Sequence, residues 1–404
     1  MPDDAPKTPA APRRVNPFTR SVPGLIGLVV LAILTGVCIF SMPWTMGRAA
    51  PDRPQRYNDG SLATVLLPPF WIPLDPTRDS REILQLEEAE ATLGYRPKPI
   101  LGTDALGRSV LVRCLAGGGI SIGIGLSAAA ISVIIGTLYG TIAAFVGGRT
   151  DAMMMRIVDV IYGLPYILLV VLLAVAGDAL IDELSFKKAA RADWMETRAA
   201  EVLQERGEAV NSDSIRLLLE SDPETRAALD AELASIDRLR PHELTQGQRK
   251  ALEVLTLLIA IGGVSWLTMA RVIRGQVLSL KNQPFVEAAR AIGAPFRRQF
   301  FKHLLPNLVG PIVVYATLTV PAAILQESFL SFLGIGVTPP LPSWGNLAAE
   351  GLGELNTVHS RWWLIVFPCL LLALTLLALN FVGEGLREAI DPKRAGRSRV
   401  AAKP

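Results

Sequence analysis

The chain has 404 residues, of which 50% are hydrophobic and 19% are charged. The charged fraction lies below the roughly 25% that is usual in soluble domains, so the composition is that of a membrane protein. A net charge of only +3 excludes a general nucleic-acid-binding surface, and three isolated histidines and three isolated cysteines indicate neither a metal cluster nor a disulfide framework.

The first predicted element is a membrane helix over residues 21–43. Residues 22–42 carry no charge and are long enough to cross a hydrocarbon core of about 30 Å. This apolar run is longer than the roughly 7–15 residues of a signal peptide. We therefore expect an uncleaved membrane anchor that follows a short basic tail, residues 1–20.

Five more apolar stretches follow a long, polar loop over residues 44–108. They lie at about 115–146, 160–177, 251–270, 307–333 and 362–383. Together with the first helix they predict an all-α polytopic membrane protein with about six transmembrane helices. The main transmembrane domain is expected over residues 109–384, followed by a tail over 385–404.

The basic residues predict the orientation in the membrane. Four groups stand beside alternate ends of the apolar stretches: Arg13 to Arg20, Arg149 to Arg156, Arg271 to Lys302, and Arg387 to Arg399. Cytoplasmic loops of membrane proteins are enriched in Lys and Arg. We therefore expect both termini and the connection 282–306 in the cytoplasm, and the loop 44–108 outside.

Residues 178–250 interrupt the apolar pattern with a polar, acidic segment that contains many helix-forming residues. The sequence Ser221-Asp222-Pro223-Glu224 predicts a capped helix start, and Leu229 and Leu233 follow it at helical spacing. We expect an extracytoplasmic helical insert, a small hairpin or bundle. A disordered linker is the alternative, which the periodic leucines disfavour.

The connection between the fourth and fifth stretches predicts a short helix. Pro284 suits the first helical turn, and Glu287 near that start favours the helix dipole. Arg290 is placed for a pair with Glu287 three residues away. Gly293 is suited to the left-handed conformation that ends a helix.

This predicted helix has a slim surface, since Ala288 and Ala289 are small. Another protein could therefore approach its backbone. A second basic turn is expected near Arg297, and Pro306 is expected to open the fifth membrane helix. The alternative is an ordinary positive loop that binds anionic lipid headgroups.

Glu327 stands within an apolar stretch, where an ionisable group is a candidate functional residue. Glu327 could face a translocation path, or it could be hydrogen-bonded near the outer end with a structural role. Asp159 is expected to pair with Arg156 one turn away. Gly136 and Gly140 predict close packing of the second membrane helix.

The run Glu287-Ala-Ala-Arg-Ala-Ile-Gly293, followed by His303-Leu-Leu-Pro306, resembles the EAA loop of permease subunits of binding-protein-dependent ABC importers. Further segments resemble the dipeptide, oligopeptide and nickel branch of that family, namely 101–108, 155–159, 324–334, 339–346 and 380–392. Their order covers most of 101–178 and 251–393. Two departures are His303, where the general pattern has Ile, and the long 178–250 insert.

The resemblance implies the type I ABC importer permease fold in the cytoplasmic membrane of a prokaryote. It also implies a homologous second permease subunit, two cytoplasmic ATPase subunits that bind ATP and Mg, and an extracytoplasmic solute-binding protein. The EAA loop would contact an ATPase subunit through the residues Glu287, Ala288, Ala289, Gly293, Arg297 and Pro306.

The sequence agrees with a translocation subunit that is not itself an enzyme, because it contains no G-x-x-x-x-G-K-[ST] motif for ATP. No cofactor is expected on this chain. The resemblance implies di- or oligopeptides as cargo, with nickel or another small solute as the alternative. A secondary transporter or channel is the alternative from another class.

Overall fold

The computed structural model describes residues 21–76, 79–236, 246–355 and 361–390. In these residues the regular elements are helices, without a β-strand, so the predicted all-α class is confirmed. The tail 1–20 and residues 391–404 of the C-terminal tail lie outside the described residues. The chain divides into two units, Met1–Tyr166 with Ile261–Pro404, and Ile167–Ala260.

Five described helices are long and apolar enough to cross a membrane. They are α1 (Val22–Thr45), α3 (Val110–Val146), α8 (Gln246–Leu280), α11 (Leu305–Phe332) and α13 (Trp363–Ile390). A sixth span requires α4 (Gly148–Tyr162) and the start of α5 (Tyr166–Glu205) to be joined as one broken helix. The break falls at Gly163-Leu164-Pro165, where proline disfavours helix in the residue before it.

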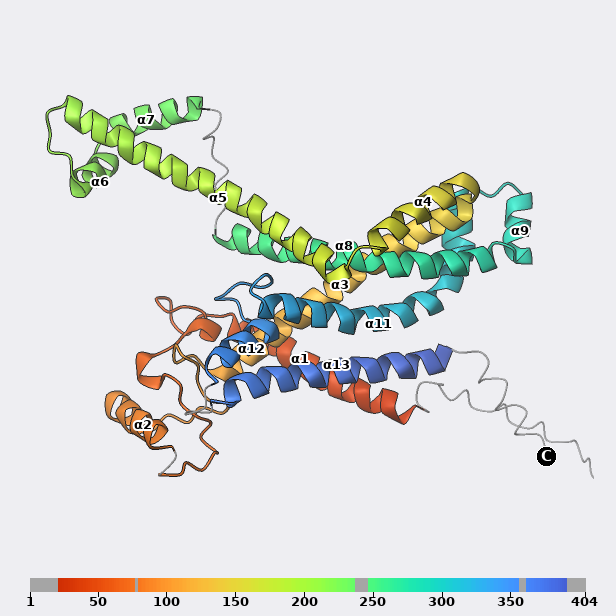
Figure 1. The fold of residues 1–404 in the computed structure, drawn as a ribbon, viewed down its shortest axis with the longest axis horizontal. Helices are drawn as coiled ribbons and strands as arrows, with labels where there is room; N and C mark the ends of the chain where they lie inside the picture. Colours follow the sequence, from red (N-terminus) through yellow and green to blue (C-terminus); the bar gives the residue numbers. More distant parts are fainter. Residues whose placement is uncertain (1–20, 77–78, 237–245, 356–360, 391–404) are drawn as a thin grey trace, which may run out of the picture. The chain divides into compact units, whose positions relative to one another are not determined.

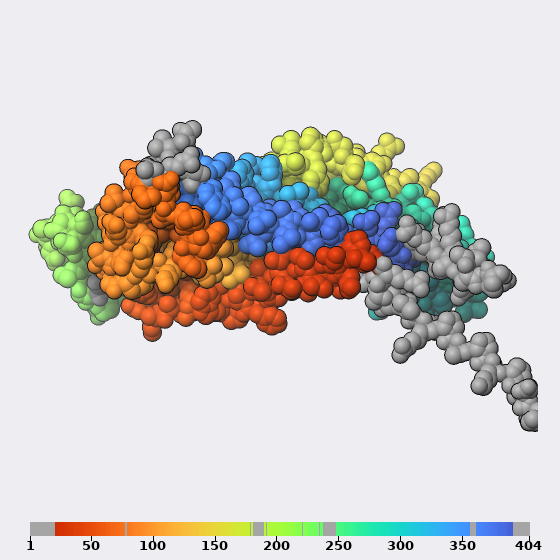
Figure 2. Space-filling model, turned by 90° about the horizontal axis from the view of Figure 1, so that it is seen from below, coloured from red at the N-terminus to blue at the C-terminus, as the bar shows by residue number. Residues whose placement is uncertain are grey.

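The segment between α1 and α3 contains more structure than the sequence predicted. It holds the short turns η2 (Arg56–Asn58) and η3 (Leu62–Thr64), and the helix α2 (Ser80–Leu93). The helix α2 ends at Gly94, whose φ of 73° is left-handed. Figure 2 shows this segment gathered at one end of α1 and α13, which lie side by side.

Glycines allow the helices of the first unit to approach closely. A Cβ atom added at Gly136 would lie 2.5 Å from Met269, and one added at Gly140 would lie 2.4 Å from the Ala270 carbonyl oxygen. The predicted close packing of α3 at these two glycines is therefore confirmed, with α8 as the neighbour. A Cβ atom at Gly27 of α1 would likewise lie 2.6 Å from Phe381 of α13.

Short helices stand at the two ends of this unit (Figure 1). At one end α9 (Pro284–Ala291), α10 (Phe296–Gln299) and the π-helical turn η5 (Phe300–Leu304) connect α8 to α11. At the opposite end of α11 and α13 lies α12 (Trp344–Gly353). We refer to these as the α9 end and the α12 end.

The second unit contains the predicted helical insert. Here α5 runs without a break past residue 178, and α6 (Ser212–Ser221) and α7 (Pro223–Ser235) follow it. A small apolar core joins the three helices, formed by Ala199, Leu203, Leu218 and Leu229. The cap of α7 is Asp222 rather than Ser221, since the Asp222 carboxylate accepts from the backbone N–H of Thr225 at 3.0 Å.

Candidate functional site

The connection at the α9 end has the local structure that its sequence predicts. Pro284 occupies the first turn of α9, and Glu287 lies in the same turn. Gly293 ends the helix with a left-handed φ of 70°. The backbone N–H of Ala294 then donates to the carbonyl of Ala289 at 3.0 Å, which closes the C-terminal end of the helix.

The two faces of α9 have different neighbours. Val286 is fully buried and Ala289 is 5% exposed, and the cluster beneath Val286 is formed by Ala144, Met269, Ile273, Val277, Phe300, Leu304 and Leu308. Glu287, Ala288 and Ile292 face outward, and Ile292 is 79% exposed. Both alanines are small, as the slim surface predicted from the sequence requires, but Ala289 is buried against the protein and Ala288 is on the open face.

Arg290 does not form the predicted ion pair with Glu287 among the described residues. Its guanidinium instead lies over the Phe145 ring, 5.6 Å from the ring centroid. The Phe145 ring also packs on Phe296, with centroids 4.6 Å apart. These contacts fasten the connection to the C-terminal end of α3, and a cation–aromatic contact of this kind favours a fixed orientation of the loop.

Beyond Gly293 the chain turns directly into a helical path that continues as α11. Arg297 is exposed on α10, and Pro306 is exposed in the first turn of α11. Between them Gln299 is buried and donates to the Ala294 carbonyl at 2.6 Å. The basic turn and the helix start at Pro306 are both as predicted, but a π-helical turn joins them, a feature frequent at functional sites.

Two ion pairs join α4 to the part of α8 that leads into this connection. Arg274 binds Asp151 through two nitrogens, each 2.6 Å from a carboxylate oxygen. Asp159 pairs with Arg271 at 2.7 Å, so the predicted pair with Arg156 is wrong. Asp159 pairs with a basic residue on a neighbouring helix rather than with the nearest one on its own helix. A single sequence does not reveal which of the two it contacts.

Glu327 is hydrogen-bonded, as the second of its two alternatives describes, and its place on a translocation path stays a prediction. Its side chain is fully buried in α11 and accepts hydrogen bonds from the hydroxyls of Ser328 and Ser331, at 3.2 and 2.8 Å. A buried carboxyl group needs such partners, since its transfer out of water is unfavourable.

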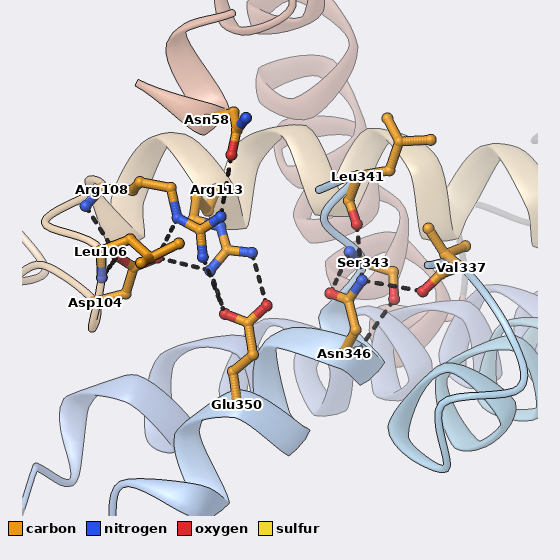
Figure 3. A network of polar contacts seen from close by, with 10 residues as sticks. All are labelled: Asn58, Asp104, Leu106, Arg108, Arg113, Val337, Leu341, Ser343, Asn346 and Glu350. Atoms are coloured by element: carbon orange, nitrogen blue, oxygen red, sulfur yellow. Dashed lines mark hydrogen bonds and ion pairs between the residues drawn. The ribbon is translucent and has the colours of Figure 1, made fainter. Parts of the chain in front are cut away.

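The α12 end contains a polar network that sequence reasoning missed (Figure 3). Arg113, only 1% exposed, donates to Asp104 at 2.7 Å and to Glu350 of α12 at 2.9 Å, with a second contact to the same Glu350 carboxylate. Arg108 donates to Asp104 at 2.7 Å and to Asn58 at 3.1 Å. A cavity of about 350 Å³ borders this network.

One signal for this network was present in the sequence. Arg113 stands near the start of an apolar helix, where an ionisable residue is a candidate functional or structural site. Its partner Glu350 is 237 positions away, and no local spacing joins the two.

Comparison with known proteins shows a matching family and similar individual proteins. Residues 132–396 match the family described as binding-protein-dependent transport system inner membrane component. The chain is 35% identical over 329 residues to the oligopeptide transport system permease protein OppC of Haemophilus influenzae, which covers 81% of this chain and 80% of that protein. It is 36% identical over 292 residues to the dipeptide transport system permease protein DppC of Bacillus subtilis, covering 72% and 68%.

Proposed function

The chain belongs to the family of binding-protein-dependent transport system inner membrane components, and from this premise we propose that it is the permease subunit of an ATP-driven importer of di- or oligopeptides. The names of the relatives support peptides over nickel as the cargo, because the proteins from Haemophilus influenzae and Bacillus subtilis are named as oligopeptide and dipeptide permeases.

The observation that carries the proposal is the seat of α9. Val286 and Ala289 anchor one face of this helix in the protein, and the other face presents Glu287, Ala288 and Ile292 to the surroundings. A short, firmly seated helix with small residues and exposed apolar side chains is suited to insertion into a groove of a partner. We infer that this partner is an ATPase subunit, since the sequence contains no phosphate-binding loop of its own.

Motion of α9 would reach the membrane helices through its seat. The apolar cluster beneath Val286 includes residues of α3, α8 and α11, so a displacement of α9 acts on three spans at once. The pairs Asp151–Arg274 and Asp159–Arg271 extend the connection from α8 to α4. Closure of the ATPase dimer would thus swing the spans between outward-facing and inward-facing states.

The proposal includes the full assembly and its orientation. A second permease subunit, two cytoplasmic ATPase subunits and an extracytoplasmic binding protein would complete the transporter. The α9 end and both termini would face the cytoplasm, as the positions of Lys and Arg favour. The insert 178–250 would face outward, where the binding protein docks.

Cysteine crosslinking tests the coupling surface with a matched pair of positions. In a variant without Cys38, Cys114 and Cys369, we expect a cysteine at Ala288 to crosslink to an ATPase subunit, because this position is exposed. A cysteine at the neighbouring Ala289 should not crosslink, because that position is buried. Crosslinking from neither position, in a transporter that takes up peptide, would reject α9 as the coupling element.

Substitution of the same surface separates coupling from assembly. We expect Glu287→Lys, or a bulky residue in place of the left-handed Gly293, to abolish transport-coupled ATP hydrolysis while the chain still inserts into the membrane.

Uptake of a labelled dipeptide, with nickel as competitor, tests the cargo. Competition by nickel at concentrations that leave unrelated uptake unchanged would favour the other cargo.

A further inference from the structure

Glu327 is a buried acid whose partners among the described residues include no Lys or Arg. It lies near the C-terminal end of α11 and is fully buried. Its carboxylate accepts hydrogen bonds from the hydroxyls of Ser328 and Ser331, and the hydroxyls of Ser121 and Ser343 lie near enough to interact with it. These come from α3, from α11 itself and from the N-cap of α12. The carboxylate therefore stands where three helices meet.

Three of these hydroxyls have a second role. Ser331 Oγ accepts from the backbone N–H of Val337 at 2.9 Å. Ser121 Oγ accepts from the N–H of Trp344 at 3.2 Å, and Ser343 Oγ accepts from the N–H of Asn346 at 3.2 Å. The three N–H groups all belong to residues 337–346, which precede and begin α12.

The carboxylate favours the orientation in which these hydroxyls accept from the backbone, and Ser331 shows both contacts. A serine hydroxyl has one proton to donate and lone pairs that accept. When a hydroxyl donates its hydrogen bond to the carboxylate, its oxygen lone pairs remain free to accept from backbone N–H groups. Successive hydrogen bonds of this kind strengthen one another. Glu327 thus acts on the backbone of residues 337–346 without touching it.

Residues 337–346 are also packed tightly against α11 and α3. A Cβ atom at Gly345 would lie 2.0 Å from the Ser328 carbonyl oxygen, so the start of α12 lies directly against α11. Trp344 is fully buried and donates to the Cys114 carbonyl of α3 at 3.1 Å. Packing fixes the distance between these helices, and the hydroxyl groups around Glu327 satisfy the buried N–H groups that this distance creates.

We propose that Glu327 is a positioning residue that holds residues 337–346, and with them α12, on α3 and α11. The Arg113–Glu350 pair binds α12 farther along its length. With both anchors in place, α12 follows α3 and α11 as one body when the spans move. This role requires no contact between the cargo and the carboxylate, which is fully buried.

Amide hydrogen exchange on the full chain in lipid nanodiscs tests this role. In Glu327→Gln, the amide adds N–H donors among hydroxyls that already accept backbone N–H groups. We expect exchange over residues 337–350 to become about tenfold faster, as the loss of a buried hydrogen bond implies. Exchange over residues 284–294 should stay at the wild-type rate. The control is Glu384→Gln, an exposed glutamate of α13, which should change neither segment.

A second variant keeps the test decisive if Glu327→Gln does not fold. Ser331→Ala retains the acid and removes one hydroxyl that accepts from Val337, so we expect a smaller rise confined to the residues around 337. Wild-type exchange in both variants would overturn the proposal. Reduced peptide uptake with unchanged exchange over 337–350 would also overturn it, because Glu327 would then act on the solute. Failure of the peptide assignment would leave the exchange result intact.

Discussion

The α9 end and the α12 end of the molecule are each held in place by opposite means. At the α9 end, apolar side chains such as Val286 and Leu304 seat a helix whose other face is open. At the α12 end, buried polar groups such as Arg113, Glu327 and Ser343 hold a helix that is largely enclosed. An apolar seat tolerates small shifts, whereas a buried polar network loses its partners when it shifts.

This difference suits the functions proposed for the two ends. The α9 helix would contact a partner and transmit its displacement to the membrane helices. An open outer face and an inner face held by non-directional apolar contacts are suited to that role. The α12 end has to keep its geometry while the spans move beneath it. Directional hydrogen bonds and a paired arginine provide that geometry.

The largest expected effect comes from a substitution in the polar network at the α12 end. We expect Arg113→Ala to lower the free energy of unfolding by about 3 kcal/mol, because it takes a buried guanidinium away from the buried Asp104 carboxylate and from Glu350. Thermal unfolding of the purified chain measures the change. The double variant Arg113→Met with Glu350→Met should recover most of it. If Arg113→Ala were no more damaging than a surface substitution, the contrast between the two ends would be lost.

A smaller effect is expected at the apolar seat. Val286→Ala removes buried methyl groups and should weaken the seat of α9 by about 2 kcal/mol. Hydrogen exchange over 284–294 should become faster, while exchange over 337–350 stays unchanged. The matched control is Ile292→Ala on the open face, which should reduce ATPase-subunit binding without changing exchange in either segment. Faster exchange at both ends would show that the two seats are not independent.

The sequence predicted the α9 end more completely than the α12 end, for a physical reason. The structure of α9 depends on local rules, because Pro284 and Gly293 define its start and stop within ten positions. The α12 network depends on Arg113 and Glu350, which only the tertiary fold brings together. The local error at the α9 end, the Arg290–Glu287 pair, also arose where tertiary packing overrode a helical spacing rule.

The smallest expected effect concerns a polar contact without burial, which tests whether burial is what makes the α12 network strong. In the second unit, Asp222 caps α7, and hydrogen bonds from the Thr225 side chain and backbone, together with Arg206, lower the pKa of its carboxyl to about 2. Because the folded pKa lies below the ordinary value, the contribution to stability is present at neutral pH. It is lost as the pH falls below the ordinary value and through about 2.

Amide protection of residues 224–226 in the full chain, corrected for intrinsic exchange, should therefore decline from pH 5 toward pH 2. Asp222→Asn should remove this dependence, because asparagine still caps a helix but does not titrate in this range. The loss should be small, since the group is open to water, where hydrogen bonds to solvent replace those in the protein. Asp222 has charged and hydroxyl partners but is not buried. If its titration cost as much stability as Arg113→Ala, burial would not be the source of the strength of the α12 network.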